Sequence, residues 1–309
     1  MVRPSYRELL HTGELQRRVE RALGLLKDCR ICPRSCGVDR LGSEKGFCRT
    51  GRYARVASFG PHFGEEAPLV GTHGSGTIFM SSCNLMCTFC QNHEISHANE
   101  GAEVDALELA SIMLDLTERG CHNINFVTPT HVVPQILEAV LVAARQGLDV
   151  PLVYNTGGYD DASTLRLLDG VFDIYMPDFK FWDEGPAAAF CRAPDYREKA
   201  CEAIREMHSQ VGDLEIDERG LAVRGLLLRH LVMPEGLAGT SRVMEFIATQ
   251  ISRDTYVNVM DQYHPCYRAR TDRLIGRRIT ASEYMEALEA AMRAGIHRLD
   301  PHSRFAFIT

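Results

Sequence analysis

From residue 76 onward, short apolar runs alternate with longer segments in which apolar residues recur every three or four positions. The short runs predict strands that are covered on both faces, and the longer segments predict amphipathic helices. The predicted strands span 76–81, 124–129, 151–156, 173–179, 226–234 and 255–261, and the predicted helices span 103–119, 132–146, 160–169, 195–211, 240–252 and 281–294. Repeated β/α units form a parallel sheet with right-handed crossovers. We therefore expect an α/β fold, either doubly wound or a partial (β/α)6 barrel, in which residues 214–225 add a β-hairpin.

The first 74 residues have a different pattern. Residues 5–27 are amphipathic and predict one helix, whereas residues 29–74 contain several glycines and little periodicity. Such a segment cannot bury much apolar area, so bound metal is an expected source of its stability. We predict two domains: residues 1–74 form a helix with a cysteine-rich metal-binding module, and residues 75–309 form the α/β barrel.

Composition excludes several classes of protein. The chain has 309 residues, of which 45% are hydrophobic, so it is not intrinsically disordered. Its formal net charge of -7 argues against a nucleic-acid-binding protein. Its apolar runs are shorter than the roughly 18 residues of a membrane-spanning helix. The N-terminus lacks the apolar core of a secretory signal, so we expect a cytoplasmic protein that does not bind membranes.

The eleven cysteines add candidate chemistry, because in a reducing compartment clustered cysteines bind metal more often than they form disulfides. Cys83, Cys87 and Cys90 follow the first predicted barrel strand with the spacing C-x3-C-x2-C. Three thiolates on one loop can hold three irons of a [4Fe–4S] cluster and leave the fourth iron open to a ligand. Chance spacing is the alternative, and the position of the motif after a strand argues against it.

Four more cysteines lie in the N-terminal segment, at Cys29, Cys32, Cys36 and Cys48. Four thiolates complete the ligand set of a structural zinc ion or a second iron–sulfur cluster, and the sequence does not choose between these metals. The isolated cysteines are expected to be small packing residues. Cys266 is the exception, because it lies beside an arginine-rich segment, 268–278, which is either a solvated loop or a clamp for an anionic or peptide substrate.

The cysteine motif, with Phe89 before its third cysteine and a (β/α)6 array behind it, resembles the radical S-adenosylmethionine (SAM) superfamily. The segments HFGEEAPLVG, HNINFVTPTHVVPQI and DIYMPDFKF are similar to those of pyruvate formate-lyase activating enzymes. The resemblance implies a partial barrel with SAM on the open iron. It also implies a flavodoxin- or ferredoxin-like reductant, and a 5′-deoxyadenosyl radical that abstracts hydrogen from a protein or peptide.

The resemblance also implies which residues bind SAM. Thr128 and Thr130 replace the family's Gly-Gly-Glu segment near the methionine amine, and their hydroxyls can accept from an ammonium group. His131 beside them is either a substrate or proton-transfer group or a helix cap. Asp178 and Lys180 match an Asp-x-Lys of the activating enzymes that can bind ribose and carboxylate groups, or they form a surface ion pair.

Further cofactor candidates follow the other strands. The predicted SAM contacts are Phe89, Asn155, Thr156, Arg229, Gln262 and His264. Arg229 lies inside an apolar strand and therefore requires a carboxylate partner. Glu65 and Glu66 in HFGEEAPLVG can face the site, although exposed acids are the common case.

Two alternatives stay open. The same cofactor residues also serve a radical enzyme that modifies a small molecule such as an amino acid. A protein of another class, a non-catalytic iron–sulfur or zinc scaffold, would bind partners without cleaving SAM.

Overall fold

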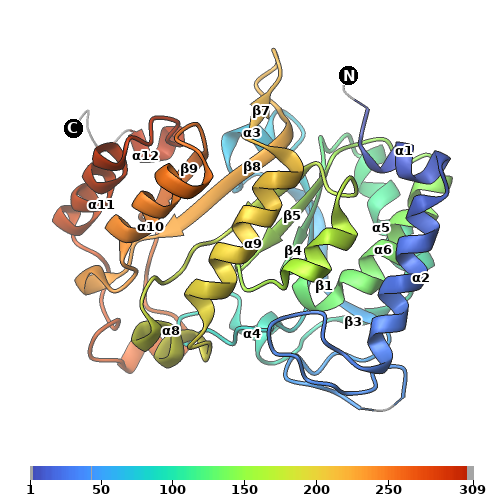
Figure 1. The fold of residues 1–309 in the computed structure, drawn as a ribbon, viewed down its shortest axis with the longest axis horizontal. Coiled ribbons are helices and arrows are strands. Elements are labelled where there is room, and N and C mark those ends of the chain that lie inside the picture. The colour runs from blue at the N-terminus through green and yellow to red at the C-terminus, as the bar shows by residue number, and fades with distance from the viewer. Residues whose placement is uncertain (1–2, 43, 305–309) are drawn as a thin grey trace.

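Six strands run parallel in one curved sheet (Figure 1), within a computed structural model that describes residues 3–42 and 44–304. Their order is β2-β4-β5-β6-β8-β9. Their bounds are β2 Ser75–Met80, β4 Ile124–Val127, β5 Leu152–Thr156, β6 Ile174–Pro177, β8 Ala222–Leu231 and β9 Tyr256–Met260. The predicted α/β class and the partial (β/α)6 barrel are confirmed, because each parallel strand coincides with a predicted strand.

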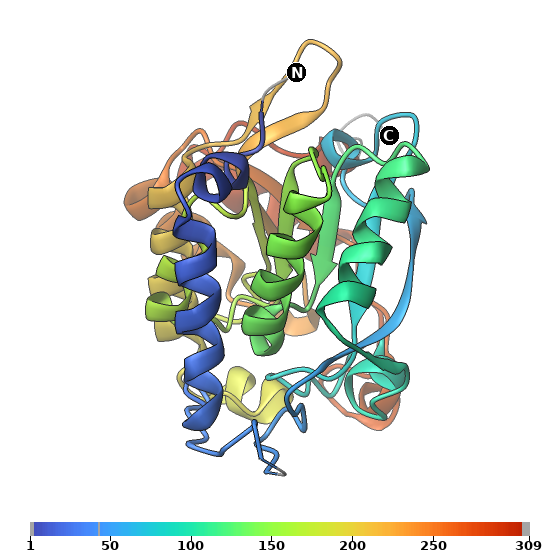
Figure 2. The ribbon, with the colours of Figure 1, turned by 90° about the vertical axis from the view of Figure 1, so that its right-hand side faces the viewer.

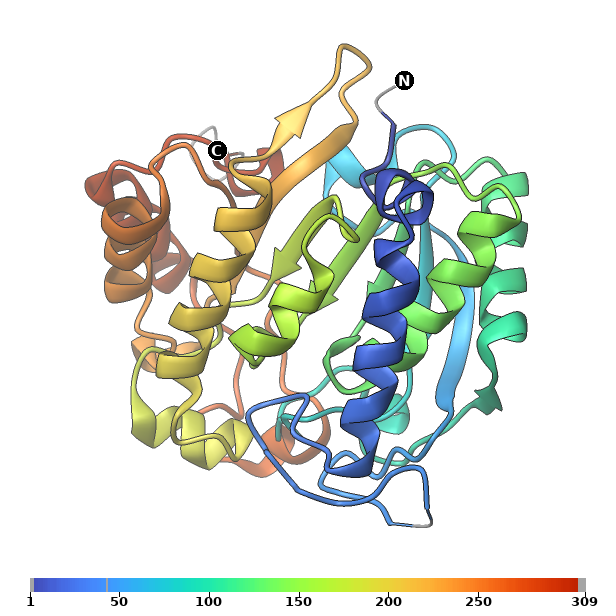
Figure 3. The same cartoon turned by 45° about the vertical axis from the view of Figure 1, so that its right-hand side comes forward.

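Helices cover the outer face of this sheet, as Figure 3 shows most clearly. They are α5 Ala106–Glu118, α6 Val133–Arg145, α7 Ala162–Leu165, α9 Tyr196–Val211, α10 Thr240–Phe246 and α11 Ala281–Ala294. Reciprocal capping boxes start α5 at Asp105 and α11 at Thr280, and Gly295 ends α11 in the left-handed conformation. These local signals explain why the predicted bounds of α11 match the observed ones.

The inner face of the barrel changes from apolar to polar along the strands. Near the amino ends of the strands, Val153, Ile174 and Leu227 pack with Leu69 in a small buried cluster. Toward the carboxyl ends, Asn155 and Arg229 occupy the inward positions of β5 and β8, because alternate residues of a strand face the same side. An apolar floor therefore closes one end, and polar side chains gather at the other.

The N-terminal segment contributes more than loops. Residues 54–62 form strand β1 (Ala54–His62), which pairs antiparallel with β2 and with the short β3 (Ala102–Val104). The loop-rich stretch expected over residues 29–74 thus contains a strand. The sequence did not predict this strand, because β1 is half-exposed and lacks the continuous apolar run that marked the other strands. The expected boundary at residue 74 consequently falls inside a sheet, between two paired strands.

The single helix expected over residues 5–27 is broken. The chain forms α1 (Tyr6–His11) and α2 (Glu14–Gly24), and Gly13 between them has φ of 74°. That left-handed conformation ends one helix before the next starts. Helix α2 then packs against α6, on the outer face of the barrel (Figure 2).

The remaining elements lie at the two ends of the barrel. At the amino ends of the strands, the predicted hairpin is confirmed as β7 (Glu215–Ile216) with the first residues of β8, and α3 (Ala67–Val70) lies nearby. At the carboxyl ends, α4 (His93–Ser96), α8 (Glu184–Cys191) and the loop between β2 and α4, here called the cysteine loop, lie along the lower edge of Figure 1. The last element is α12 (Pro301–Arg304). No helix among the described residues is long and apolar enough to cross a membrane.

Candidate active site at the carboxyl ends of the parallel strands

The loop after β2 carries the first three candidate ligands. Cys83, Cys87 and Cys90 all line one cavity of about 170 Å³. Burial, with a smaller contribution from the neighbouring Cys87 and Cys90 thiols, raises the pKa of the Cys83 thiol to about 12. Free thiolates are therefore disfavoured here, whereas thiolates bound to iron have a counter-charge. The three residues fit a cluster with one open iron.

Long-range hydrogen bonds hold this loop in place. The Thr88 amide donates to the Phe190 carbonyl at the end of α8 (2.8 Å). The Thr88 carbonyl in turn accepts from the amides of Arg268 and Ala269, both at 3.1 Å. On the other side, the Asn84 side-chain amide donates to the Tyr159 carbonyl (2.7 Å). The loop is thus fixed by segments from three distant parts of the chain.

Cys191 lies beside this loop, which the sequence did not indicate. Its sulfur is 3.3 Å from the sulfur of Cys87, and its side chain is fully buried at the end of α8. The expectation that it is a packing residue is therefore incomplete, since it touches a candidate iron ligand. The two cysteines are 104 positions apart in the sequence, so no local motif could predict their contact.

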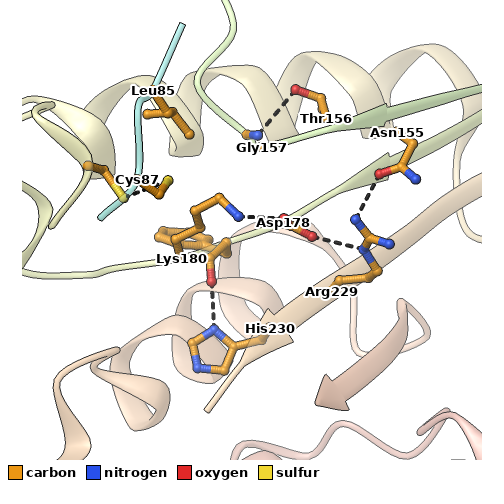
Figure 4. Close-up of polar contacts among 12 residues, drawn as sticks. Leu85, Cys87, Asn155, Thr156, Gly157, Asp178, Lys180, Arg229 and His230 are labelled. Atoms are coloured by element: carbon orange, nitrogen blue, oxygen red, sulfur yellow. Dashed lines mark hydrogen bonds and ion pairs between the residues drawn. The ribbon is translucent and has the colours of Figure 1, made fainter. Parts of the chain in front are cut away.

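A chain of charged and polar side chains crosses the strand ends (Figure 4). The Lys180 ammonium donates to Asp178 at 2.6 Å, and the Arg229 guanidinium donates to the other oxygen of Asp178 at 2.8 Å. Arg229 also donates to the Asn155 amide oxygen at 2.7 Å. The predicted carboxylate partner of Arg229 is thus Asp178 on the neighbouring strand, and Glu65 lies 3.6 Å from its other end.

The electrostatics of this group follow from burial and pairing. Burial alone would raise the pKa of Asp178, but the Arg229 and Lys180 cations outweigh it and lower that pKa. For Lys180, desolvation opposes the charge, while Asp178 and the nearby Cys87 favour it, so its pKa is raised. Asp178, Lys180 and Arg229 are therefore all charged at neutral pH and line the same cavity as the cysteine loop.

The predicted threonines have different surroundings. Thr128 lines the cavity beside the cysteines in a left-handed conformation (φ 62°), and Thr156 lines it as well. Thr130 is buried, and its hydroxyl donates to Asp160 at 2.7 Å. Thr156 donates to the second oxygen of Asp160 at 2.6 Å. Asp160 therefore fixes the turn after β5, and the Thr130 hydroxyl is already engaged.

His131 is fully buried behind the cysteine loop. Its Nε2 atom lies 2.8 Å from the Ser81 carbonyl, and its Nδ1 atom has no hydrogen-bond partner among the described residues. Burial lowers the pKa of this imidazole to about 4, so it is neutral. The side chain does not line the cavity that holds Cys87 and Lys180. Its position suits the support of the loop rather than proton transfer to a substrate.

Residues around and after β9 form another part of the lining of the main cavity, in contact with the cysteine loop. Phe89 is buried against the edges of Phe181 and Tyr263, and both Phe89 and Gln262 line the main cavity of about 310 Å³. The His264 imidazole lies beyond it, 3.5 Å from the Gln91 amide. Cys266 is buried below the 267–271 turn and is not part of the cavity lining.

The N-terminal cysteines form a second group. Burial, with smaller contributions from the nearby Cys48 and Cys29, raises the pKa of Cys32 to about 12. The Cys36 sulfur accepts from the Phe47 amide at 3.4 Å. Arg40 is fully buried beside them, 3.7 Å from the Cys29 sulfur. In residues 3–42 and 44–304 no three His, Cys, Asp or Glu side chains are close enough to hold a single metal ion.

Arg34 connects the two cysteine groups. Its guanidinium donates to the carbonyls of Asn84 (2.7 Å) and Arg192 (2.5 Å), next to the cysteine loop and α8. The same guanidinium lies over the Phe47 ring, 3.9 Å from its centre. This link was not predicted, because one arginine in a loop has no pattern that marks it.

Comparison with known proteins identifies relatives of the chain. The sequence profile of the Radical SAM superfamily matches residues 77–213, which run from β2 through the cysteine loop to the end of α9. The chain is 33% identical over 294 residues to the uncharacterized protein MJ0674 of Methanocaldococcus jannaschii. That match covers 92% of this chain and 80% of the relative.

Two solved structures align with much of this chain. A radical SAM methyltransferase from Sphaerobacter thermophilus aligns with a TM-score of 0.49 and 12% identity, over 72% of this chain and 64% of that chain. HydG, a maturase of the [FeFe]-hydrogenase, aligns with a TM-score of 0.49 and 12% identity, over 75% of this chain and 54% of that chain. The chain spans less than two thirds of the length of either structure.

Proposed function

This chain belongs to the radical SAM superfamily. We propose that it is an enzyme that abstracts a hydrogen atom from a protein or peptide substrate, and that the reaction takes place in the main cavity. The enzyme uses a [4Fe–4S] cluster and SAM as cofactors. When bound, the cluster and SAM would supply a 5′-deoxyadenosyl radical for the hydrogen transfer, with the electron coming from a flavodoxin- or ferredoxin-like reductant and with methionine, 5′-deoxyadenosine and a substrate radical as the products.

One observation carries this proposal. Asp178, Lys180 and Arg229 line the same cavity as Cys87 and Cys90, so the charged chain at the strand ends faces the candidate iron ligands. In the proposed site, Cys83, Cys87 and Cys90 bind three irons. Lys180 and Arg229 can donate to a carboxylate, and Asp178 can accept from ribose hydroxyls. The apolar side chains of Phe89 and Met260 exclude water from the same space.

A macromolecular substrate is supported by the surface next to the cavity mouth. Tyr263 lines the cavity and donates to the Ile275 carbonyl at 2.6 Å, which places the 266–278 segment beside the opening. Leu274 in that segment is 52% exposed, and Arg270 and Arg273 are exposed as well. Arg277 is engaged by Glu235 and Glu283 and is not available to a substrate. A glycyl residue of a protein is the proposed hydrogen donor.

A small-molecule substrate is the second candidate. A cavity of about 310 Å³ lies at the lower end of the roughly 300–1,000 Å³ range of small-ligand sites. An amino acid beside the cofactor would occupy such a volume without contact with the 266–278 segment.

We propose that the N-terminal cysteines hold a second metal, either zinc or an iron–sulfur cluster, and that metal binding draws together their four thiols, which do not converge on one point in this structure. The fully buried Arg40 supports this proposal, because a buried guanidinium needs an anionic neighbour. Its nitrogen lies 3.7 Å from the Cys29 sulfur, and metal-bound thiolates supply negative charge there.

The first experiment tests SAM cleavage. The reconstituted enzyme is reduced anaerobically with dithionite in the presence of SAM, and 5′-deoxyadenosine is quantified. Simultaneous replacement of Cys83, Cys87 and Cys90 by Ala should abolish formation of 5′-deoxyadenosine and lower the iron content by the amount of one cluster. Replacement of Cys29, Cys32, Cys36 and Cys48 should instead remove the second metal, and metal analysis identifies it. No product from the wild-type enzyme would support the scaffold alternative.

The second experiment separates the substrates. A glycine-containing protein or peptide deuterated at the glycyl Cα should transfer deuterium to 5′-deoxyadenosine and leave a glycyl radical visible by electron paramagnetic resonance. Transfer from deuterated free amino acids, with none from the peptide, would favour the small-molecule function.

A further inference from the structure

A second polar cavity lies beside the main one, between the Gly64–Glu66 segment and the end of β9. It has a volume of about 260 Å³, and its lining includes Glu65, Glu66, Asn258, Asp261 and Gln262. Glu65, Arg229, Met260 and Gln262 also line the main cavity, so the two cavities adjoin. A molecule that enters the smaller cavity can therefore extend into the larger one.

Hydrogen-bond acceptors predominate in this smaller cavity. Three carboxylates line it, at Glu65, Glu66 and Asp261, and the cation among its lining residues is Arg229. Arg229 already donates to Asp178 and Asn155 and is 3.6 Å from Glu65. Its charge is therefore shared, and the cavity has an excess of negative charge.

A buried carboxylate oxygen in this cavity lacks a hydrogen-bond partner in the described part of the chain. Glu66 is only 5% exposed; its Oε1 atom accepts from the Asn258 amide at 2.8 Å, whereas its Oε2 atom has no partner among the described residues. An unpaired buried carboxylate oxygen is costly, so this position favours a ligand that donates hydrogen bonds.

We propose that Glu65 and Glu66 bind an alkylammonium or guanidinium group of the substrate and hold the rest of the substrate in the main cavity. The inference rests on the proposed function and adds the chemical class of the substrate. Such a group offers several donors and a positive charge, which match the free Glu66 oxygen and the excess negative charge. The group can belong to a free amino compound or to a basic side chain of a peptide.

The ionisation of Glu65 agrees with this arrangement. Burial raises its pKa to about 7; the facing Arg229 opposes this effect, and the facing Glu66 and Asp178 add to it. Without a ligand, Glu65 is therefore partly protonated at neutral pH. A bound cation favours the carboxylate and should release about half a proton at pH 7.

The test measures binding to the reconstituted holoenzyme by anaerobic titration calorimetry, with n-butylammonium as the probe. Tetramethylammonium, which has charge but no donors, is the matched ligand control. We expect n-butylammonium to bind with proton release, seen as a heat that depends on the buffer. Tetramethylammonium should not bind. Free lysine and the peptide Gly-Lys-Gly then show whether the cavity accepts a free amino compound, a peptide-borne cation or both.

Glu66→Gln tests the carboxylate, because glutamine keeps an oxygen for Asn258 but loses the charge. We expect at least tenfold weaker n-butylammonium binding in this variant and unchanged binding in Glu218→Gln, on the exposed hairpin turn. Equal binding in both variants, or no binding by the wild-type enzyme, would overturn the inference.

SAM provides the remaining distinction, because it also carries an ammonium group. In Glu66→Gln, the loss of n-butylammonium affinity should exceed any loss of SAM affinity, and titration of both ligands on the same preparation compares the two losses. A loss of SAM affinity with intact n-butylammonium binding would assign Glu66 to the cofactor and overturn the inference. Absence of SAM cleavage in the wild type would instead refute the proposed function, whatever the binding result.

Discussion

Asp178 is the residue on which the charges of the site converge. It binds Lys180 at 2.6 Å and Arg229 at 2.8 Å, and each of these three side chains is less than a fifth exposed. An ion pair in such surroundings contributes little net stability, but the loss of one partner leaves buried charge uncompensated.

Asp178→Asn should therefore lower the free energy of unfolding by about 3–5 kcal/mol and weaken SAM binding. Urea denaturation and SAM titration under anaerobic conditions measure these two effects. Asp183→Asn is the matched control, because Asp183 pairs with Arg242 at the surface and such pairs contribute less than about 1 kcal/mol. Similar losses in the two variants would show that the buried position of Asp178 is not what matters.

Glu65 makes the stability of the fold depend on pH with a sign opposite to that of an ordinary paired acid. Its folded-state pKa of about 7 lies above the roughly 4.3 of an unfolded glutamate. Its contribution to stability is thus fully present below about pH 4.3 and is lost as the pH rises through about 7.

The prediction is that Glu65→Gln gains stability relative to the wild type between pH 5 and 8, on the order of 3 kcal/mol at the upper end. Denaturation curves across this range measure the difference. Parallel curves for the two proteins at all pH values would contradict the raised pKa.

Single residues also mark the limit of sequence reasoning. The cysteine spacing and the Asp-x-Lys pattern are local, so the sequence alone identified the cysteine loop and the pair Asp178 and Lys180. The fold brings both to one cavity. Cys191 reaches the same region from α8 only through tertiary packing. Glu65, one of two acids that the sequence offered as able to face the site, lines the cavity beside Arg229.

Among the secondary-structure elements, the turn between β5 and α7 positions two strand ends at once. Gly158 there has φ of 78°, and a Cβ atom on it would lie 2.2 Å from the Asp178 carbonyl oxygen. The Tyr196 hydroxyl from α9 donates at 2.9 Å to that carbonyl and to the Gly157 carbonyl. Backbone contact rather than side-chain packing therefore sets the distance between these strand ends.

Gly158→Ala should separate the ends of β5 and β6 and displace Asp178, because both the conformation and the space require glycine. We expect a loss of several kilocalories per mole of stability and at least tenfold weaker SAM binding, measured by denaturation and titration. Gly185→Ala in α8 is the control, since no atom lies within 4 Å of its added Cβ. Tolerance of Gly158→Ala would mean that the turn can adapt.

The secondary-structure elements differed in how well they could be predicted from sequence. Helices with capping boxes, such as α5 and α11, and strands with continuous apolar runs were predictable. Strand β1 was not, because it lies near the sheet edge and alternates only weakly between buried and exposed residues. Its existence depends on pairing with β2 and β3, which is a non-local effect.

Considered as one body, the protein joins its N-terminal cysteine group to the barrel through several side chains, with Arg34 and Arg52 among them. Arg34 contacts the backbone of the cysteine loop and of α8, and Arg52 pairs with Glu138 of α6 at 2.8 Å. The guanidinium of Arg34 is also sandwiched by Phe47 and Tyr159. Arg34 therefore couples the order of the two cysteine groups.

Arg34→Met should lower the hydrogen-exchange protection of residues 29–50 and of the loop around Asn84, because the bridging hydrogen bonds are lost. Mass spectrometry of the exchanged, metal-loaded protein measures this change. Arg30→Met is the control, since Arg30 is 60% exposed and pairs with Asp28 in its own loop. Loss of protection confined to residues 29–50 would show that the two groups are independent.

The hydrogen bonds of Thr88 have a consequence for the biosynthesis of the protein. The loop that carries Cys83, Cys87 and Cys90 is fixed by Phe190 and by Ala269, which leave the ribosome much later. Until the last of these partners emerges, the loop has its contacts with Arg34 and Tyr159 but lacks those that fix Thr88. Iron–sulfur assembly is therefore expected to act on a nearly complete chain, and a product that ends before residue 266 would expose reactive thiols without a site to receive the cluster.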